Sequence, residues 1–147
     1  MNKNSQRPVV RMGLSLLLLL ATQLAPAQAA DIKLQRQGEY TFITGGQNDD
    51  ETAAMDAQAP KYPIQLTFRN KGETLGVKDV TVRVRNVKGD IDVETVSGGP
   101  YLYINPPASG RFTIEAELGG EKLSMTRDLV GRRYLHLLFE FGRAKKE

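Results

Sequence analysis

Three consecutive acidic residues, Asp49, Asp50 and Glu51, could together bind a cation. Ca²⁺ takes carboxylate and carbonyl oxygens as ligands, and these side chains supply both carboxylates and charge. Successive residues of a helix point about 100° apart, so three in a row cannot all face one ion, and no calcium-loop spacing is present. The other interpretation is a helix start, with Asn48 as N-cap and Glu51 completing a capping-box-like pair. We expect the helix start, and neither a metal nor a cofactor.

Nucleophilic catalysis has few candidate residues in this sequence. It contains no cysteine, and beyond residue 29 the serines are Ser97, Ser109 and Ser124, none of them in a G-x-S-x-G turn. The single histidine, His136, lies in an apolar strand-like run, and one histidine is too few for zinc. Many Asp and Glu pairs could approach each other as in glycosidases, but nothing marks one of them. We expect no enzyme, with a small carboxylate-based hydrolase as the alternative.

A glycine-rich turn precedes two tyrosines that could form a binding surface. Tyr101 and Tyr103 share one strand face, so they point outward if Leu102 and Ile104 face the core; otherwise the tyrosines themselves are core. Exposed tyrosines offer an amphipathic contact area. The candidate interaction surface joins this turn to the acidic stretch and its preceding glycine pair: Gly45, Gly46, Asp49, Asp50, Glu51, Gly98, Gly99, Pro100, Tyr101 and Tyr103.

The first 29 residues have the pattern of a cleavable signal peptide. Lys3, Arg7 and Arg11 precede an apolar run over residues 12–21, and Ala27-Gln28-Ala29 provides a small–x–small cleavage site. An apolar run of about 10 residues is half of what a membrane-spanning helix needs. The absence of an Arg-Arg pair favours the general secretory route. We therefore expect a periplasmic protein, or one released into the medium, without a stable membrane anchor after cleavage.

Removing this segment changes the charge balance. The whole chain of 147 residues has 20 Lys and Arg against 17 Asp and Glu, and residues 1–29 hold three of the bases and no acid. The remaining chain is formally neutral, which argues against nucleic acid as a partner because phosphate binding needs surplus positive charge. Without cysteines, an exported domain must be stabilised by burial rather than by disulfides.

Beyond the acidic stretch, apolar and polar residues alternate with period two, as between Tyr62 and Phe68. This pattern predicts half-buried strands separated by glycine and proline turns. We expect strands at 39–44, 62–69, 79–87, 91–96, 101–104, 111–118 and 121–130, with an eighth at 133–141. A short alanine-rich helix follows Asn48 and ends at Pro60, which cannot continue it.

The expected fold class is therefore all-β: a seven- to eight-stranded antiparallel β-sandwich of Ig/transthyretin-like type with one short N-terminal helix. Residues 1–29 form the signal peptide, residues 30–60 the N-terminal strand and helix, and residues 61–142 the sandwich proper. Residues from 39 to 142 make one domain, and residues 143–147 form a disordered tail.

The hairpin expected around Lys88-Gly89-Asp90 carries opposite charges on its two arms. Arg83 and Arg85 face Asp92 and Glu94, and such pairs stabilise a sheet by a few tenths of a kcal/mol. An anion-binding patch is the alternative, but the matching acids favour a self-neutralised surface.

The central part of the chain resembles the carboxypeptidase regulatory-like domains. The resemblance is carried by the following segments: Gly76–Val84, Gly89-Asp90, Tyr101–Pro107 and Gly110–Ile114. The chain departs from the usual L-P-P-G of that family, because Asn105 stands for leucine and Ala108-Ser109 separate Pro107 from Gly110. The stretch with Gly45-Gly46, Glu51 and Met55 is similar to small periplasmic proteobacterial members. The resemblance, which extends over residues 40–141, implies a transthyretin-like sandwich and no particular activity.

These observations favour an exported, non-catalytic interaction module of the bacterial periplasm. Its partner would be an envelope protein, a peptide or a glycan. Besides the hydrolase, a second alternative is a structural or chaperone-like subunit that adds a strand to another chain through an open sheet edge.

Overall fold

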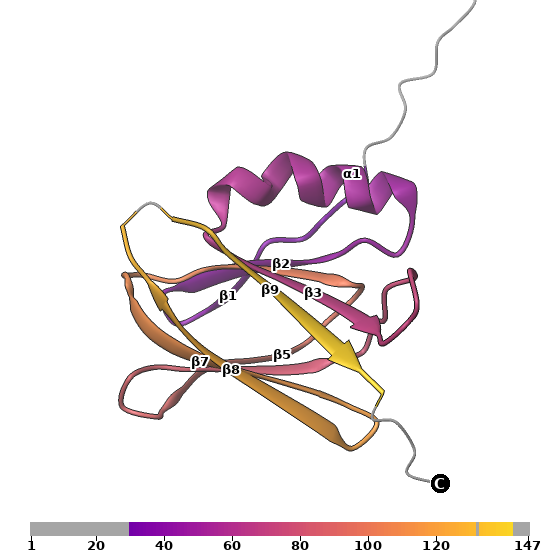
Figure 1. The fold of residues 1–147 in the computed structure, drawn as a ribbon. Helices are drawn as coiled ribbons and strands as arrows, with labels where there is room; N and C mark the ends of the chain where they lie inside the picture. Colours follow the sequence, from indigo (N-terminus) through magenta and orange to yellow (C-terminus); the bar gives the residue numbers. More distant parts are fainter. Residues whose placement is uncertain (1–29, 132, 143–147) are drawn as a thin grey trace, which may run out of the picture.

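The computed structural model describes residues 30–131 and 133–142, which form two β-sheets packed face to face and one α-helix (Figure 1). The expected signal peptide at 1–29 and the expected tail at 143–147 lie outside these residues. In Figure 1, the sheets are the upper and lower layers, and helix α1 lies above the upper one. The prediction of an all-β sandwich with one short helix is thus confirmed for the described part of the chain.

The first sheet has the strand order β1-β2-β6-β3-β9. Its strands are β1 (Gln35–Gln37), β2 (Tyr40–Gly45), β6 (Tyr101–Asn105), β3 (Ile64–Asn70) and β9 (Leu135–Phe141). The second sheet has the order β5-β4-β7-β8. Its strands are β5 (Ile91–Val96), β4 (Thr81–Arg85), β7 (Gly110–Leu118) and β8 (Glu121–Leu129).

The main core lies between the sheets and consists of the apolar residues of each alternating pattern. Ile64, Leu66 and Phe68 of β3 are fully buried, as are Val82 and Val84 of β4. Their polar neighbours in sequence face outward, since successive side chains of a strand point to opposite faces. Burial of this apolar surface is the main stabilising contribution in a chain without disulfides.

Two features of the strand arrangement differ from the expectation. The described residues contain nine strands rather than seven or eight. The additional strand, β1, was not predicted because its sequence has no apolar alternation. The pairing of β9 with β3 is parallel, with Ile64 opposite Leu135, whereas the other strand pairs are antiparallel. The chain after β8 crosses from the second sheet to the first, so β9 enters beside β3 in the same direction.

Helix α1 (Asp49–Gln58) begins as the sequence indicates and ends two residues before Pro60. The side chain of Asn48 accepts a hydrogen bond from the backbone N–H of Glu51 at 2.9 Å, and its amide donates to the Glu51 carboxylate at 3.2 Å. The acidic first turn complements the positive end of the helix dipole. After Gln58 the chain continues as a short 3₁₀ turn, η1 (Ala59–Lys61), which contains Pro60. The prediction of a helix start at the acidic residues is confirmed.

Helix α1 covers the outer face of the first sheet and forms a second, smaller core there. Met55 of the helix is fully buried and packs with Ile43, Tyr62 and Tyr103. The helix therefore converts a sheet face that would otherwise meet solvent into a buried layer.

Candidate functional site

The two glycine-rich stretches of the candidate surface, far apart in sequence, come together at one end of the sandwich. Gly45 ends β2 and Gly46 follows it, and Gly98 and Gly99 lie in the loop before β6. A Cβ atom on Gly99 would overlap the backbone of Gly45, and one on Gly46 would overlap the ring of Tyr101. Only glycine allows these segments to approach so closely.

A third segment, which the sequence did not link to this surface, joins at Gly76. A Cβ atom there would overlap the ring of Pro100. We call Gly45, Gly46, Gly76, Gly98 and Gly99 the glycine junction. It holds together the end of β2, the loop before β4 and the loop before β6.

Hydrogen bonds fix the glycine junction. The hydroxyl of Thr44 donates to the carbonyl oxygen of Tyr101 at 2.7 Å and accepts from the N–H of Gly98 at 3.0 Å. The side-chain amide of Gln47 donates to the carbonyl oxygen of Gly98 at 2.6 Å. The backbone N–H of Phe68 donates to the carbonyl oxygen of Pro100 at 2.8 Å. The junction is therefore tied both to β2 and to the strand β3 of the main core.

A surface hollow of about 370 Å³ lies beside the junction and is lined by Gly46, Gln47, Leu75, Gly76, Lys78 and Pro100. We call it the junction hollow. Leu75 is 78% exposed and so remains accessible to a ligand. The side-chain nitrogen of Gln47 donates its hydrogen bond to Gly98, so the side-chain oxygen of Gln47 remains as an acceptor.

The lining of the junction hollow combines apolar, charged and hydrogen-bonding groups. Leu75 and Pro100 provide apolar contact, Lys78 a positive charge, and Gln47 a hydrogen-bond acceptor. Such a combination suits a ligand with an apolar group next to a carboxylate. No Ser, Cys, His, Asp or Glu is among its lining residues.

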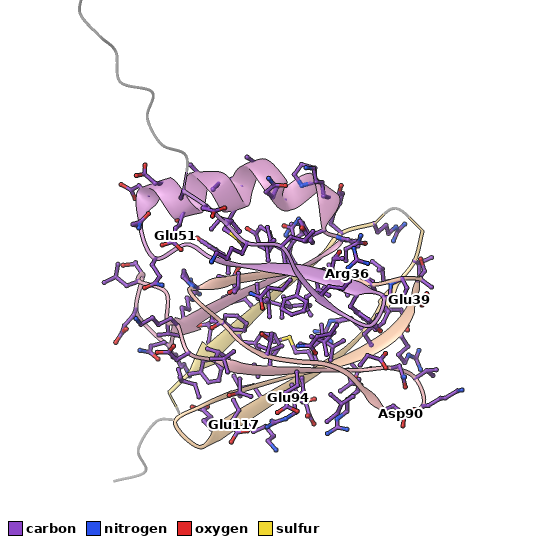
Figure 2. All side chains as sticks on the ribbon, turned by 180° about the vertical axis from the view of Figure 1, so that it is seen from behind. Arg36, Glu39, Glu51, Asp90, Glu94 and Glu117 are labelled. Atoms are coloured by element: carbon purple, nitrogen blue, oxygen red, sulfur yellow. The ribbon has the colours of Figure 1, made fainter. Side chains whose placement is uncertain are left out.

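Of the ten residues of the candidate surface, Gly46 and Pro100 line this hollow, and Gly45, Gly98 and Gly99 form the frame behind it. Asp49, Asp50 and Glu51 lie in the first turn of α1. Figure 2 shows Glu51 at the start of the helix. The sequence left out four lining residues: Gln47, which follows Gly46, and Leu75, Gly76 and Lys78, which lie in an irregular loop where no periodic pattern could place them.

The interpretation of Tyr101 and Tyr103 as an exposed binding surface is wrong. Leu102 and Ile104 do face the main core, so Tyr101 and Tyr103 point away from it. Helix α1 covers that outer face, however, and leaves Tyr103 only 6% exposed and Tyr101 half-buried. Burial, followed by the nearby charge of Asp56, raises the pKa of Tyr103 to about 12. The tyrosine pair, with ring centres 6.1 Å apart, belongs to the second core.

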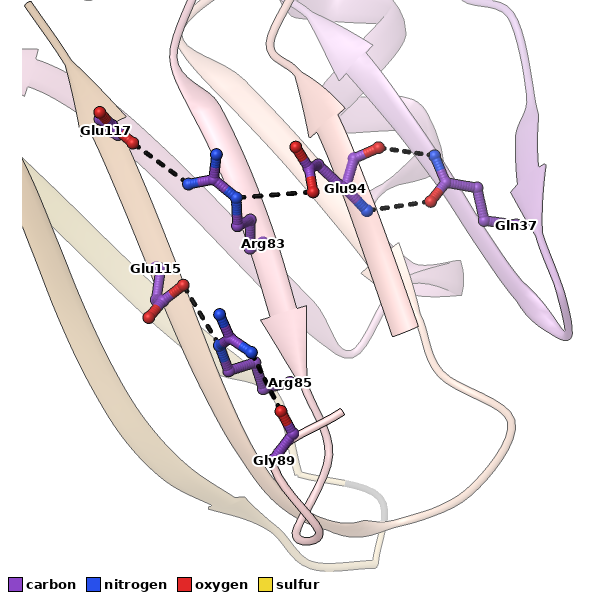
Figure 3. Close-up of polar contacts among 7 residues, drawn as sticks. All are labelled: Gln37, Arg83, Arg85, Gly89, Glu94, Glu115 and Glu117. Atoms are coloured by element: carbon purple, nitrogen blue, oxygen red, sulfur yellow. Dashed lines mark hydrogen bonds and ion pairs between the residues drawn. The ribbon is translucent and has the colours of Figure 1, made fainter. Parts of the chain in front are cut away.

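The arginines of β4 are neutralised, although not by all of the partners expected. Arg83 forms ion pairs with Glu94 at 3.5 Å and Glu117 at 3.1 Å (Figure 3). Arg85 pairs with Glu115 of β7 at 3.3 Å rather than with Asp92. The reason is a register shift between Val84 and Arg85, which places Arg85 opposite Ile91.

Asp92 instead belongs to a polar cluster that the sequence did not reveal. Its carboxylate accepts hydrogen bonds from the hydroxyl of Tyr40 at 2.6 Å and from the side chain of Asn86 at 3.0 Å. Burial, and then the hydrogen bond and charge of Asp92, raise the pKa of Tyr40 above its ordinary value. The cluster connects the two sheets and is a structural contact.

The remaining residues with catalytic potential lie outside the lining of the junction hollow. Ser97 is buried, and its hydroxyl accepts a hydrogen bond from the N–H of Val80 at 3.0 Å. His136 is exposed on β9, beside a shallow hollow whose lining includes Tyr134 and Asp56. Within residues 30–131 and 133–142, no three His, Asp or Glu side chains are grouped so that they could hold a metal ion.

Comparison with known protein families, curated proteins and solved structures finds no match to this chain. No helix in the described part of the chain has the length and apolar character needed to cross a membrane.

Proposed function

We propose that this protein is an exported, non-catalytic β-sandwich of the bacterial periplasm that binds a peptide segment of an envelope protein in the junction hollow. The observation that carries the proposal is the junction itself. Three chain segments meet at Gly46, Gly76 and Gly99, where an added Cβ atom would overlap a neighbour, and a hydrogen-bonded frame supports the hollow. Binding sites gain affinity when their groups are held in place before the ligand arrives. The two-sheet arrangement is compatible with the transthyretin-like sandwich that the family resemblance implies.

A peptide suits the hollow better than a glycan does. Sugar binding commonly relies on stacking against an exposed aromatic ring, and the lining residues include none. Leu75 and Lys78 instead offer an apolar contact beside a positive charge. The expected ligand is an extended peptide with a carboxylate next to an apolar side chain.

The binding prediction can be tested with a library of short peptides displayed on phage and the purified chain from residue 30. Selected peptides should contain an acidic residue beside an apolar one. Lys78→Glu should weaken binding of a selected peptide about tenfold or more, because it places like charges together, a loss of about 1.4 kcal/mol. Leu75→Asp should do the same by removing the apolar contact. Fluorescence polarisation measures both.

The matched control is Lys88→Glu, which makes the same charge change on an exposed lysine in the β4–β5 turn, away from the hollow. This variant should bind as the parent does. Equal weakening by both lysine variants would mean that only net charge matters, and it would contradict the proposed site.

The export part of the proposal rests on the pattern of residues 1–29 alone. When the full chain is expressed in a Gram-negative host, the protein recovered from the periplasm should begin at Ala30 or Asp31. Mass spectrometry of the intact protein measures this directly. Recovery of protein that still carries Met1, or its retention in the cytoplasm, would contradict export by this route.

A further inference from the structure

The two sheets have four edge strands, β1 and β9 in the first sheet and β5 and β8 in the second. An edge strand exposes unpaired backbone groups that can pair with another chain. Strand β1 has only three residues. Strand β5 is blocked by the side chain of Gln37, whose amide group donates to the carbonyl oxygen of Glu94 at 2.8 Å and accepts from its N–H at 2.9 Å (Figure 3).

Strand β8 is different, because it is nine residues long and its outer side is open. It follows β7 through the turn Gly119-Gly120, whose positive φ angles of 56° and 80° are those of a type I′ turn. In such a turn Leu118 and Glu121 form a hydrogen-bonded pair. Hydrogen-bonded and non-hydrogen-bonded pairs then alternate along the β7–β8 ladder. The backbone groups of Lys122, Ser124, Thr126 and Asp128 therefore point away from β7.

The outward backbone groups of β8 lack partners from other strands within the described residues. The carbonyl oxygen of Thr126 takes a bond at 2.8 Å from the side chain of the neighbouring Arg127, which confirms that it points outward. Strand β9 is shorter, with seven residues, and just beyond its end the N–H of Gly142 donates to the carboxylate of Glu121 in β8 at 2.8 Å. Strand β8 is thus the longest open edge in the described structure.

We propose that β8 pairs antiparallel with β8 of a second copy of this chain, about a two-fold axis at Met125. In this register Lys122 of each copy lies opposite Asp128 of the other, and Ser124 lies opposite Thr126. The first pair brings together opposite charges and the second two hydroxyls, both of which stabilise cross-strand neighbours. The same edge strand on both copies is what a two-fold interface requires.

The row of charges continues across the joined sheets. Asp128 already forms an ion pair with Arg111 of β7 at 2.7 Å, and Lys122 lies opposite Glu117 in the β7–β8 register. In the dimer, Arg111 and Asp128 of one copy would therefore lie beside Lys122 and Glu117 of the other. Basic and acidic side chains alternate across this row of four. A shift of the register by two residues in either direction would remove this alternation.

The core-facing side of β8 supplies apolar surface to the proposed interface. Leu123 and Met125 are half-buried and pack against the main core from the open side of the sandwich. Pairing would cover both residues, and Met125 would contact its own counterpart at the axis. Strand β8 shares no residue with the junction hollow, so the dimer does not depend on the proposed peptide binding.

The most direct test uses the absence of cysteine from the chain. In the proposed register Met125 meets its counterpart as a non-hydrogen-bonded pair, with Cα atoms about 4.5 Å apart, within the range of about 4.4–6.8 Å for disulfides. Met125→Cys should therefore form a disulfide-linked dimer under mild oxidation. In the control Thr126→Cys the two thiols are out of register, and their Cα atoms lie beyond the roughly 7 Å limit. Equal cross-linking of the two variants, or none with Met125→Cys, would overturn the proposal.

A charge exchange tests the same interface without cross-linking. Lys122→Asp and Asp128→Lys each place like charges opposite one another, so each variant alone should be monomeric in sedimentation equilibrium. A mixture of the two restores both opposite-charge pairs and should dimerise, which also shows that both variants are folded. A parent chain that stays monomeric, or a dimer unaffected by either reversal, would overturn the β8 interface in favour of a monomer or another edge such as β9.

Discussion

Gly99→Ala should lower the free energy of unfolding by about 3 kcal/mol, and it should abolish peptide binding at the junction hollow. The added Cβ atom would overlap the carbonyl group of Gly45, which is backbone and cannot rotate away. Overpacking of this kind typically costs about 1–3 kcal/mol, with the upper end expected where backbone must move. Urea denaturation of the purified chain measures the loss.

The adjacent residue provides the control for this prediction. A Cβ atom on Gly98 would meet the Cγ2 atom of Thr44 at 3.5 Å, which is ordinary van der Waals contact. Gly98→Ala should therefore change stability by less than about 1 kcal/mol and retain binding. If the two alanine variants behave alike, the close approach at Gly99 does not support the hollow.

Met55→Ala should destabilise the protein by about 3 kcal/mol, because it leaves a cavity between α1 and the first sheet. Met55 is fully buried there among Ile43, Tyr62 and Tyr103. Met55→Leu conserves the volume and should cost less than about 1.5 kcal/mol. Thermal unfolding followed by circular dichroism distinguishes the two variants.

The same substitution has a second, independent readout. Burial raises the pKa of Tyr103 to about 12 from an ordinary value of 10.0. A group with a raised folded-state pKa stabilises the fold fully below pH 10, and this contribution is lost as the pH rises through about 12. Met55→Ala admits water and should lower the pKa of Tyr103, as measured by tyrosinate absorbance. An unchanged titration would mean that α1 does not shield this tyrosine.

The period-two patterns were sufficient to predict most of the sandwich. Eight of the nine strands in the described residues lie where the sequence indicated a strand. Strand β1, with the sequence Gln-Arg-Gln, has no apolar face and could not be recognised. The parallel pairing of β3 with β9 depends on the path of the chain between the sheets, which local patterns do not contain.

The candidate surface was predicted in part. The glycine pairs at 45–46 and 98–99 were assigned to one candidate surface, and the structure brings them together. Leu75, Gly76 and Lys78 were missed because they reach the hollow through an irregular loop. The tyrosines were misjudged because their exposure depends on where α1 lies, and the weakly amphipathic helix does not show which face it covers.

The most direct test of the central claim is amide chemical-shift mapping of the ¹⁵N-labelled chain from residue 30 with a selected acidic–apolar peptide. Binding in the junction hollow predicts that the largest shifts occur at Gly46, Gln47, Gly76 and Lys78, next to the residues of the loop before β6. Shifts confined to β8, or to the surface around Tyr134 and His136, would place the peptide elsewhere and contradict the proposed function.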